Sequence, residues 1–147
     1  MRNTKKILRI AIYQTLNGNV NYNSANVPVY DEKVPSNVSA DIYILLSTQQ
    51  EVENNDDSSF TTLSSIDVEV CQRTGSEVSK DSIDDIEELV TNILQPTPIT
   101  DGLADPSLIQ ILNFKRVRSL SRALELSPTE SILRNIITFQ ADVIQQS

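Results

Sequence analysis

The sequence contains no histidine and no tryptophan, and it has only one cysteine among 147 residues. Without histidine, a Ser-His-Asp triad, a Cys-His pair and a histidine metal ligand are all excluded. A single Cys71 makes neither an intramolecular disulfide nor a cysteine zinc site, so a small packed or half-exposed thiol is predicted there. The commonest catalytic and metal-binding arrangements are therefore absent, and we expect no cofactor and no metal.

Glycine and long apolar runs are also scarce. The three glycines, Gly18, Gly75 and Gly102, are too dispersed to build a phosphate-binding loop. No segment approaches the roughly 20 apolar residues that span a bilayer. The basic and then apolar amino terminus is reminiscent of a signal peptide, but Arg9 and Tyr13 interrupt the apolar run and no cleavage site follows. We expect a soluble protein that is not secreted by this route and does not contact a membrane.

Acidic residues outnumber basic residues by 20 to 12, which gives a net charge of −8. This balance disfavours nonspecific binding to nucleic acid, because such binding depends on Lys and Arg neutralising phosphates. The length is that of one ordinary domain, and it is sufficient for a core without disulfides or metals. We therefore expect a single domain over residues 1–147.

Residues 27–71 carry the clearest pattern, two strands joined by a polar, acidic connector. The strand at 62–72 alternates, which predicts a buried face with Ile66, Val68 and Val70 and a wet face with Ser65, Asp67 and Glu69. The strand at 42–47 is apolar on both sides, so a central strand covered twice is predicted. The connector at 48–61 lacks the glycine pair or proline of a tight turn. We expect a long hairpin that projects beyond the sheet, with a mobile tip over residues 51–57 in the free subunit.

Two amphipathic helices are predicted, at residues 4–16 and 82–95, from apolar side chains at helical spacing. The second helix has acidic residues crowded into its first half, where the helix dipole favours negative charge. Because the calcium-loop pattern is missing, these carboxylates indicate a solvated helix face rather than a metal site.

The remaining elements complete an α+β pattern. A short strand at 27–30 contains Pro28 and is therefore predicted at a sheet edge. A proline-rich break at 96–107 precedes a strand at 108–126, with a kink near Asn113, and a last strand at 131–144 that pairs with it after a turn at 127–130. The order α-β-β-β-α-β-β predicts an α+β fold with an antiparallel or mixed sheet, a long projecting hairpin, and both helices on one face.

A basic run, FKRVRSLSR, stands out in this acidic chain. On a regular strand Arg116, Arg118 and Arg122 share one side and Lys115 lies on the other. One interpretation is a contact strip for an acidic neighbour, such as the acidic hairpin or acidic helix of an identical subunit. The other is an exposed sheet face kept soluble by charge. The candidate subunit-interface residues are Glu51, Glu53, Asp56, Asp57, Arg116, Arg118 and Arg122.

Asp67 and Glu69 share a strand face, which raises the question of an acid/base pair. Glycosidase chemistry requires two carboxylates on opposite sides of a cleft, usually between aromatic platforms. Aromatic residues are few, with three Phe, four Tyr and no Trp. We expect no enzyme activity.

Several segments of the sequence, taken in order, resemble those of a known protein family. They are a first helix ending in LNGNV, then VPVYDEKVP, DIYILLSTQQ, a polar hairpin, the strand IDVEV, and the helix EVSKDSIDDIEELVTNIL. Together they resemble the small tail-terminator or tail-completion (neck) proteins of tailed bacteriophages, over most of the chain. The likeness rests on a pattern of elements and not on a catalytic signature.

The resemblance implies a non-enzymatic virion structural protein, assembled in the host cytoplasm, that forms a ring at the head–tail junction. In that family the long hairpin and the sheet edges make contacts between subunits. Neighbouring neck, portal and tail proteins are the implied partners, and DNA passes through the central hole without specific binding. The chain departs from the simplest members after Leu94, so terminator, head-closure ring and collar remain open. The alternative interpretation is a monomeric cytoplasmic adaptor that binds one charged partner.

Overall fold

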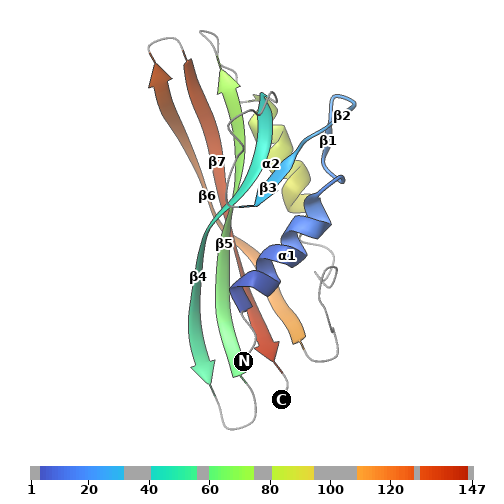
Figure 1. Cartoon of the computed structure of the whole chain (residues 1–147), viewed down its shortest axis with the longest axis vertical. Helices are drawn as coiled ribbons and strands as arrows, with labels where there is room; N and C mark the ends of the chain where they lie inside the picture. Colours follow the sequence, from blue (N-terminus) through green and yellow to red (C-terminus); the bar gives the residue numbers. More distant parts are fainter. Residues whose placement is uncertain are drawn as a thin grey trace.

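The computed structural model describes residues 4–31, 41–55, 60–74, 81–94, 109–127 and 130–145. In chain order its elements are α1 (Thr4–Leu16), β1 (Asn21–Tyr22), β2 (Ala25–Asn26), β3 (Val29–Asp31), β4 (Ile42–Asn55), β5 (Phe60–Thr74), α2 (Asp81–Leu94), β6 (Ile109–Ser127) and β7 (Glu130–Gln145) (Figure 1). Both predicted helices and all the predicted long strands are confirmed. The loop at 32–40, the break at 96–107 and the turn residues 128–129 lie outside the described residues.

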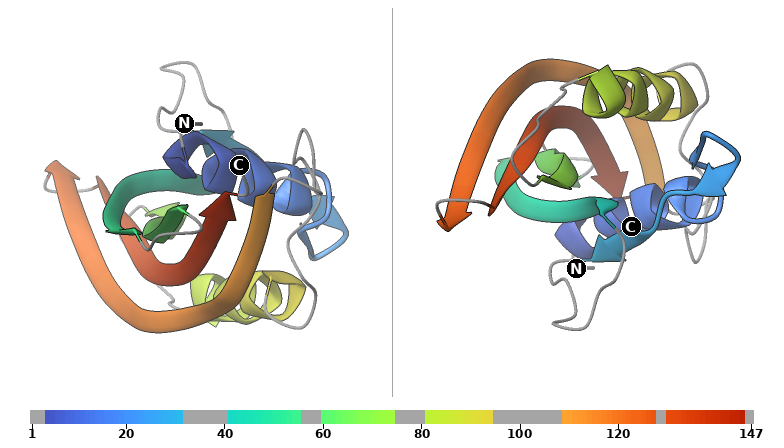
Figure 2. Two further views of the ribbon diagram at one scale, coloured as in Figure 1. Left: turned by 90° about the horizontal axis from the view of Figure 1, so that it is seen from below. Right: turned by 90° about the horizontal axis from the view of Figure 1, so that it is seen from above.

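Five strands form one mixed sheet in the order β3-β4-β5-β7-β6. The short β3 pairs with β4 in parallel, and the other pairs are antiparallel. The α+β fold is thus confirmed, with the short strand after Pro28 at one edge as predicted and β6 at the other. Seen along the long axis, β6 and β7 bend as nested arcs, as expected for long strands with the usual right-handed twist (Figure 2).

The small hairpin of β1 and β2 was not predicted from the sequence. Its two turn residues, Asn23 and Ser24, have φ angles of 51° and 64°. Positive φ at both central positions is the geometry of a type I′ hairpin turn, which Asn tolerates well. The strands are only two residues long and carry no alternating apolar pattern, so periodicity gave no signal.

Both helices pack on the same face of the sheet, which is called the helix face below. In Figure 1 they lie to the right of β4 and β5, and α1 contacts β3, β4, β5 and α2, whereas α2 contacts β5 and β7. One apolar cluster joins the two helices to the sheet, and its fully buried large side chains include Leu8, Ile12, Leu16, Ile44, Leu46, Ile66, Ile83, Ile86, Leu94, Ile137 and Phe139. The alternation predicted for the strand at 62–72 points Ile66, Val68 and Val70 inward as expected.

Local features fix the ends and the orientation of the helices. Helix α1 stops before Gly18, whose φ of 82° lies in the left-handed region that glycine adopts at no steric cost. Arg9 ties α1 to the sheet, because its Nε lies 2.9 Å from a carboxylate oxygen of Asp31 on β3. Asp81 and Asp84 occupy the first turn of α2, where the dipole stabilises negative charge. No helix within the described ranges is long and apolar enough to cross a bilayer.

The predicted long connector between β4 and β5 is mostly strand. The two strands pair from Ile42 opposite Gln72 down to Asn55 opposite Phe60, with one register shift after Leu46. Strand β5 also pairs with β7 as far as Phe60 opposite Gln145. Only residues 56–59 remain between the strands, and they lie outside the described residues. Residues 51–55 are therefore strand rather than the predicted mobile tip, because their backbone pairs with residues 60–64 of β5.

Candidate functional site, an assembly surface

Strand β6 is exposed along most of its length. Every residue from 115 to 126 is exposed, on both faces of the strand, and no further strand pairs with its outer edge in the described part of the chain. Four large hydrophobic side chains are among the exposed residues: Val117, Leu120, Leu124 and Leu126. Long unpaired edges with apolar side chains are templates for pairing with another chain, and soluble proteins usually cover or charge them. Strand β6 is therefore the leading candidate for a contact surface.

Three register shifts with β7 interrupt strand β6, and the first two divide the cations between the faces in a way that simple alternation does not predict. The pairing register with β7 shifts between Leu112 and Lys115 and again between Arg116 and Arg118. The first shift lies at the kink predicted near Asn113. Each bulge inserts an extra residue and moves the following side chains to the other face. The first shift comes before Lys115, so among the cations of the basic run the alternation breaks once, between Arg116 and Arg118.

As a result, the predicted grouping of the cations is wrong. Arg116 lies opposite Phe139 and points to the helix face. Arg118 and Lys115 lie opposite Thr138 and Gln140, on the face that the helices leave uncovered, which is called the open face below. Arg122 also lies on the open face. Lys115 thus joins Arg118 and Arg122, and Arg116 is the cation that lies apart.

Arg116 is held within its own subunit. Its Nη2 lies 2.9 Å from Glu87 Oε2 on α2, and the other Glu87 oxygen accepts a 2.8 Å hydrogen bond from the Ser119 hydroxyl. Next to this pair, the Asn135 amide donates to Asp84 on α2 at 2.7 Å and accepts a hydrogen bond from Ser121 on β6 at 2.8 Å. Through these contacts the acidic side of α2 anchors β6 and β7, an internal role that its sequence pattern does not predict.

Arg118 and Arg122 remain on the open face, together with exposed leucines. Arg118 donates a long 3.5 Å hydrogen bond to the Thr138 hydroxyl, which in turn donates to Asp67 at 2.7 Å. Arg122 lies directly opposite Arg134 of β7. Like charges placed opposite each other on adjacent strands are unfavourable unless an anion compensates them. Glu69 pairs with Arg134, and no ion pair of Arg122 occurs among the described residues.

Of the four predicted acidic candidates, two lie on β4 and two lie outside the described residues. Glu51 is exposed on the lower part of β4, opposite Ser64 of β5, and Glu53 follows it opposite Thr62. Asp56 and Asp57 fall in the segment 56–59. The structure does not bring Glu51 or Glu53 near the cations of β6 within one subunit, because β5 and β7 separate their strands.

The open face also holds a buried polar cluster where a wet surface was predicted. Glu69 is only 7% exposed and accepts a 3.2 Å bond from the Arg134 guanidinium. Cys71 and Tyr43 lie directly opposite each other beside this pair, and both are buried. Tyr43 also packs edge-on against Tyr30, with ring centroids 6.0 Å apart. The prediction of a wet face is thus wrong at Glu69, where the carboxylate is buried and paired with Arg134 of the adjacent strand β7.

Burial sets the chemistry of the two weak acids in this cluster. Loss of solvent, reinforced by the negative charge of Glu69, raises the pKa of Cys71 from 9.0 to about 12. Burial likewise raises the pKa of Tyr43. A thiol held in its protonated form is a poor nucleophile and a poor metal ligand. The cluster is therefore structural, which agrees with the packed thiol predicted for Cys71.

The folded protein should protect Cys71 from thiol reagents at about pH 8, whereas the unfolded chain should react rapidly.

The raised pKa of Cys71 has a further consequence for the pH dependence of stability. The contribution of the protonated Cys71 thiol to the free energy of unfolding is fully present below its unfolded pKa of 9.0. This contribution is lost as the pH rises toward about 12. Unfolding melts from neutral to alkaline pH should show this loss, and Cys71→Ala should show a smaller one, since Tyr43 still titrates. An equal loss of stability at alkaline pH in the parent and in Cys71→Ala would contradict a raised pKa for the Cys71 thiol.

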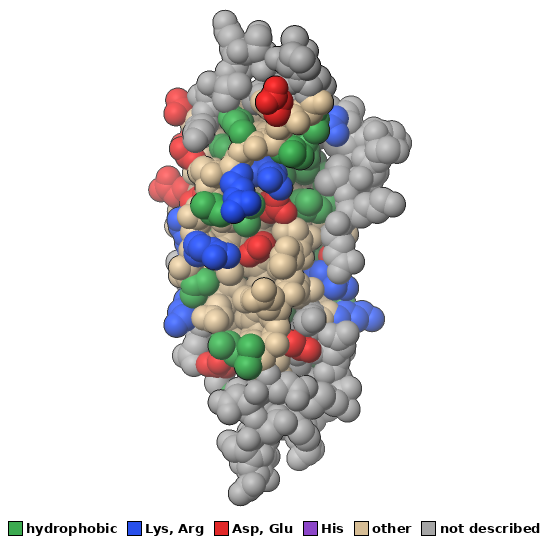
Figure 3. All heavy atoms as spheres, turned by 90° about the vertical axis from the view of Figure 1, so that its left-hand side faces the viewer, with side chains coloured by type: hydrophobic (Ala, Val, Ile, Leu, Met, Phe, Trp, Pro, Cys, Tyr) green, Lys and Arg blue, Asp and Glu red, His purple; other side chains and the backbone are tan. Residues whose placement is uncertain are grey.

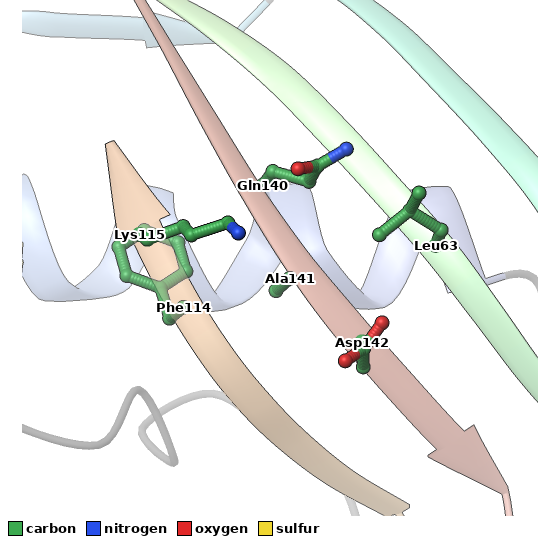
Figure 4. A pocket seen from close by; sticks show the side chains of 6 residues that line it. All are labelled: Leu63, Phe114, Lys115, Gln140, Ala141 and Asp142. Atoms are coloured by element: carbon green, nitrogen blue, oxygen red, sulfur yellow. The ribbon is translucent and has the colours of Figure 1, made fainter. Parts of the chain in front are cut away.

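A shallow depression lies where the first bulge separates β6 from β7. It has a volume of about 480 Å³ and is lined by Leu63, Phe114, Lys115, Gln140, Ala141 and Asp142 (Figure 4). The Phe114 ring stacks on Phe139 at 5.2 Å, so it belongs to the core more than to a ligand site. No group of three or more potential metal-ligating side chains occurs in the ranges that the structure describes. The depression is open and has no convergent set of titratable groups.

Comparison with known proteins gives a likeness of fold. No protein-family model matches the chain, and no curated protein matches it either. Among solved structures, it is similar to a chain of the virion of native gene transfer agent (GTA) particle, with a TM-score of 0.71 and 17% sequence identity. The match covers 95% of this chain and 96% of that chain. The α+β fold is therefore one that occurs in a virion component.

Proposed function

We propose that the protein is a non-enzymatic structural component of a phage or phage-like virion. The observation that carries the proposal is strand β6, which is exposed on both faces and at its edge while displaying Val117, Leu120, Leu124 and Leu126. Such a strand is poorly suited to a free monomer and well suited to an intersubunit contact. The similarity in fold to a chain of a gene transfer agent virion supports the same class of protein.

Within that class, the proposed role is a ring at the head–tail junction, as a tail-terminator, tail-completion or neck protein. The sequence segments that resemble this family and the basic surface of β6 in an acidic chain support the role. Opposite-charge surfaces on one subunit form head-to-tail contacts, which give a ring when the rotation between subunits closes. The ring would join neighbouring neck, portal and tail proteins. The net charge of −8 would let DNA pass through the lumen without sticking.

A monomeric adaptor is the second candidate, since the same β6 surface could bind one acidic partner instead of another copy of the chain. The location also differs between the two: subunits of a ring assemble in the host cytoplasm and end in the virion, whereas an adaptor stays cytoplasmic. Oligomeric state separates them directly, because only a ring protein builds a closed oligomer by itself.

Size-exclusion chromatography with light scattering tests the proposal on the purified chain. We expect a concentration-dependent oligomer of defined mass at low salt, and closed rings in electron micrographs of that fraction. Replacing Leu120 and Leu124 together with serine should convert the oligomer into a folded monomer, because the apolar contact is lost. A parent protein that stays monomeric at every concentration and salt would contradict the ring and favour the adaptor.

A further inference from the structure

Six side chains on β6 and β7 form a small patch on the open face. The register pairs them in three successive rows, Leu120 with Ile136, Arg122 with Arg134 and Leu124 with Ile132. Two arginines thus face each other between two pairs of apolar side chains, and the six residues are called the arginine patch below. Figure 3 looks onto the side of the molecule that lies away from the helices, where Lys and Arg side chains are interspersed with hydrophobic ones.

The arginine patch has more positive than negative charge. Arg134 Nη1 lies 3.2 Å from Glu69 Oε1, so one of the two facing arginines is paired. Among the described residues Arg122 makes no ion pair. Cys71 lies directly opposite Arg134 on β5, but its buried thiol stays protonated and supplies no charge. The two guanidinium groups therefore have one carboxylate between them.

Both the chemistry of the arginine patch and its surroundings favour an anion at this place. Facing like charges on adjacent strands repel each other, and an anion bound between them removes the repulsion. Arg134 keeps donors for a second ligand, since Glu69 contacts one of its amino groups and its Nε has no hydrogen-bond partner. Guanidinium groups present planar forks of N–H donors that match the two oxygens of a carboxylate. The apolar rows on either side lower the local dielectric constant, which strengthens such hydrogen bonds.

From this arrangement we infer that Arg122 and Arg134 form a binding site for one carboxylate group. A bound carboxylate brings the number of negative charges up to the number of guanidinium groups, whereas a phosphate dianion exceeds it. In an assembled particle the carboxylate would belong to an aspartate or glutamate of a protein seated on the open face. The inference goes beyond the proposed function, because the site is a property of the single subunit.

The other two cations of β6 on the open face do not have a second cation opposite them. Arg118 lies opposite Thr138 and Lys115 lies opposite Gln140, and both partners are neutral. Replacing Arg118 with glutamine removes one positive charge from the same face and leaves the facing arginines intact. Arg118→Gln is therefore the matched control for Arg122→Gln, which removes one half of the site.

Nuclear magnetic resonance of protein isotope-labelled at the arginine Nε atoms tests the site, with acetate as the carboxylate probe. Sodium acetate replaces sodium chloride at constant ionic strength, so that general screening stays the same. We expect the Nε–H resonances of Arg122 and Arg134 to shift along a saturating curve. Followed on Arg134, binding should weaken by at least about tenfold in Arg122→Gln, the usual effect of losing a hydrogen bond to a charged group. Arg118→Gln should bind acetate like the parent.

Inorganic phosphate at the same ionic strength tests the class of ligand. We expect it to bind the parent more weakly than acetate does, and tighter binding of phosphate would overturn the assignment to a carboxylate. Acetate shifts of Arg134 that are equal in the parent and in Arg122→Gln would overturn the site itself. These experiments do not measure the mass of an oligomer. Failure of the proposed ring is therefore distinguishable from failure of this inference.

A second variant, Arg122→Glu, supplies the carboxylate from within the chain. Opposite charges then face each other across β6 and β7 in place of like charges, which is favourable. The urea midpoint of Arg122→Glu should be no lower than that of Arg122→Gln, and Arg134 should no longer respond to acetate. A lower midpoint together with an undiminished response of Arg134 to acetate would contradict the inference.

Discussion

Replacing Phe139 with alanine is expected to lower the free energy of unfolding by about 3–5 kcal/mol, the usual loss for a buried aromatic truncation. The Phe139 side chain is completely buried on β7 and stacks on Phe114 at 5.2 Å and 10°. It lies opposite Ile66 of β5 and Arg116 of β6, so the cavity would open at the centre of the sheet. This loss is a large share of the ~5–15 kcal/mol that stabilises a small domain.

A denaturant melt followed by circular dichroism measures the effect. The matched control is Leu126→Ala, an exposed apolar residue that should change the free energy by less than about 1 kcal/mol in the monomer. The parent and both variants should be melted at two protein concentrations. A substitution that weakens an intersubunit contact reduces the concentration dependence of the midpoint, whereas a core substitution lowers the midpoint at both concentrations. A decrease in the free energy of unfolding of less than about 1 kcal/mol for Phe139→Ala would contradict the assignment of Phe139 to a tightly packed core.

Reversing Arg118 and Arg122 together to glutamate is expected to weaken assembly by at least about tenfold at low salt, which corresponds to about 1.4 kcal/mol. Both side chains are exposed on the open face, and Arg122 has no counter-ion among the described residues. An acidic strand of a neighbour is repelled by the reversed charges. Because the screening length is about 8 Å at physiological salt, the difference from the parent should shrink as salt is raised.

The charge-preserving variant Arg118→Lys with Arg122→Lys is the matched control, and it should assemble like the parent. Arg116 is left unchanged in both variants because its ion pair with Glu87 holds β6 against α2. Thermal melts should show that the double reversal folds normally, since exposed substitutions usually change stability by less than about 0.5 kcal/mol. Unchanged assembly of the reversed variant at low and high salt would remove these arginines from the interface.

The fold was predictable to a large extent because its main signals are local. The apolar stripes that include Leu8 and Ile12, or Ile83 and Ile86, identify the helices, and the alternation around Ile66 and Phe139 identifies the strands and their buried faces. The charge and the missing histidine are properties of composition alone. Local runs of charge also identified the acidic and basic interface candidates. Which of these side chains lie close together depends on pairing between segments that are distant in the sequence.

Periodicity and composition by themselves determined the two helices, the long strands, the buried faces and the absence of common catalytic groups. Only the tertiary structure decided which way the cations of β6 point, because a bulge depends on the register with β7 and moved Arg116 away from Arg118. Tertiary structure also decided that Glu69 is buried, since its partner Arg134 is 65 residues away in the chain. Long-range pairing, which a local pattern does not encode, is the physical reason for both differences.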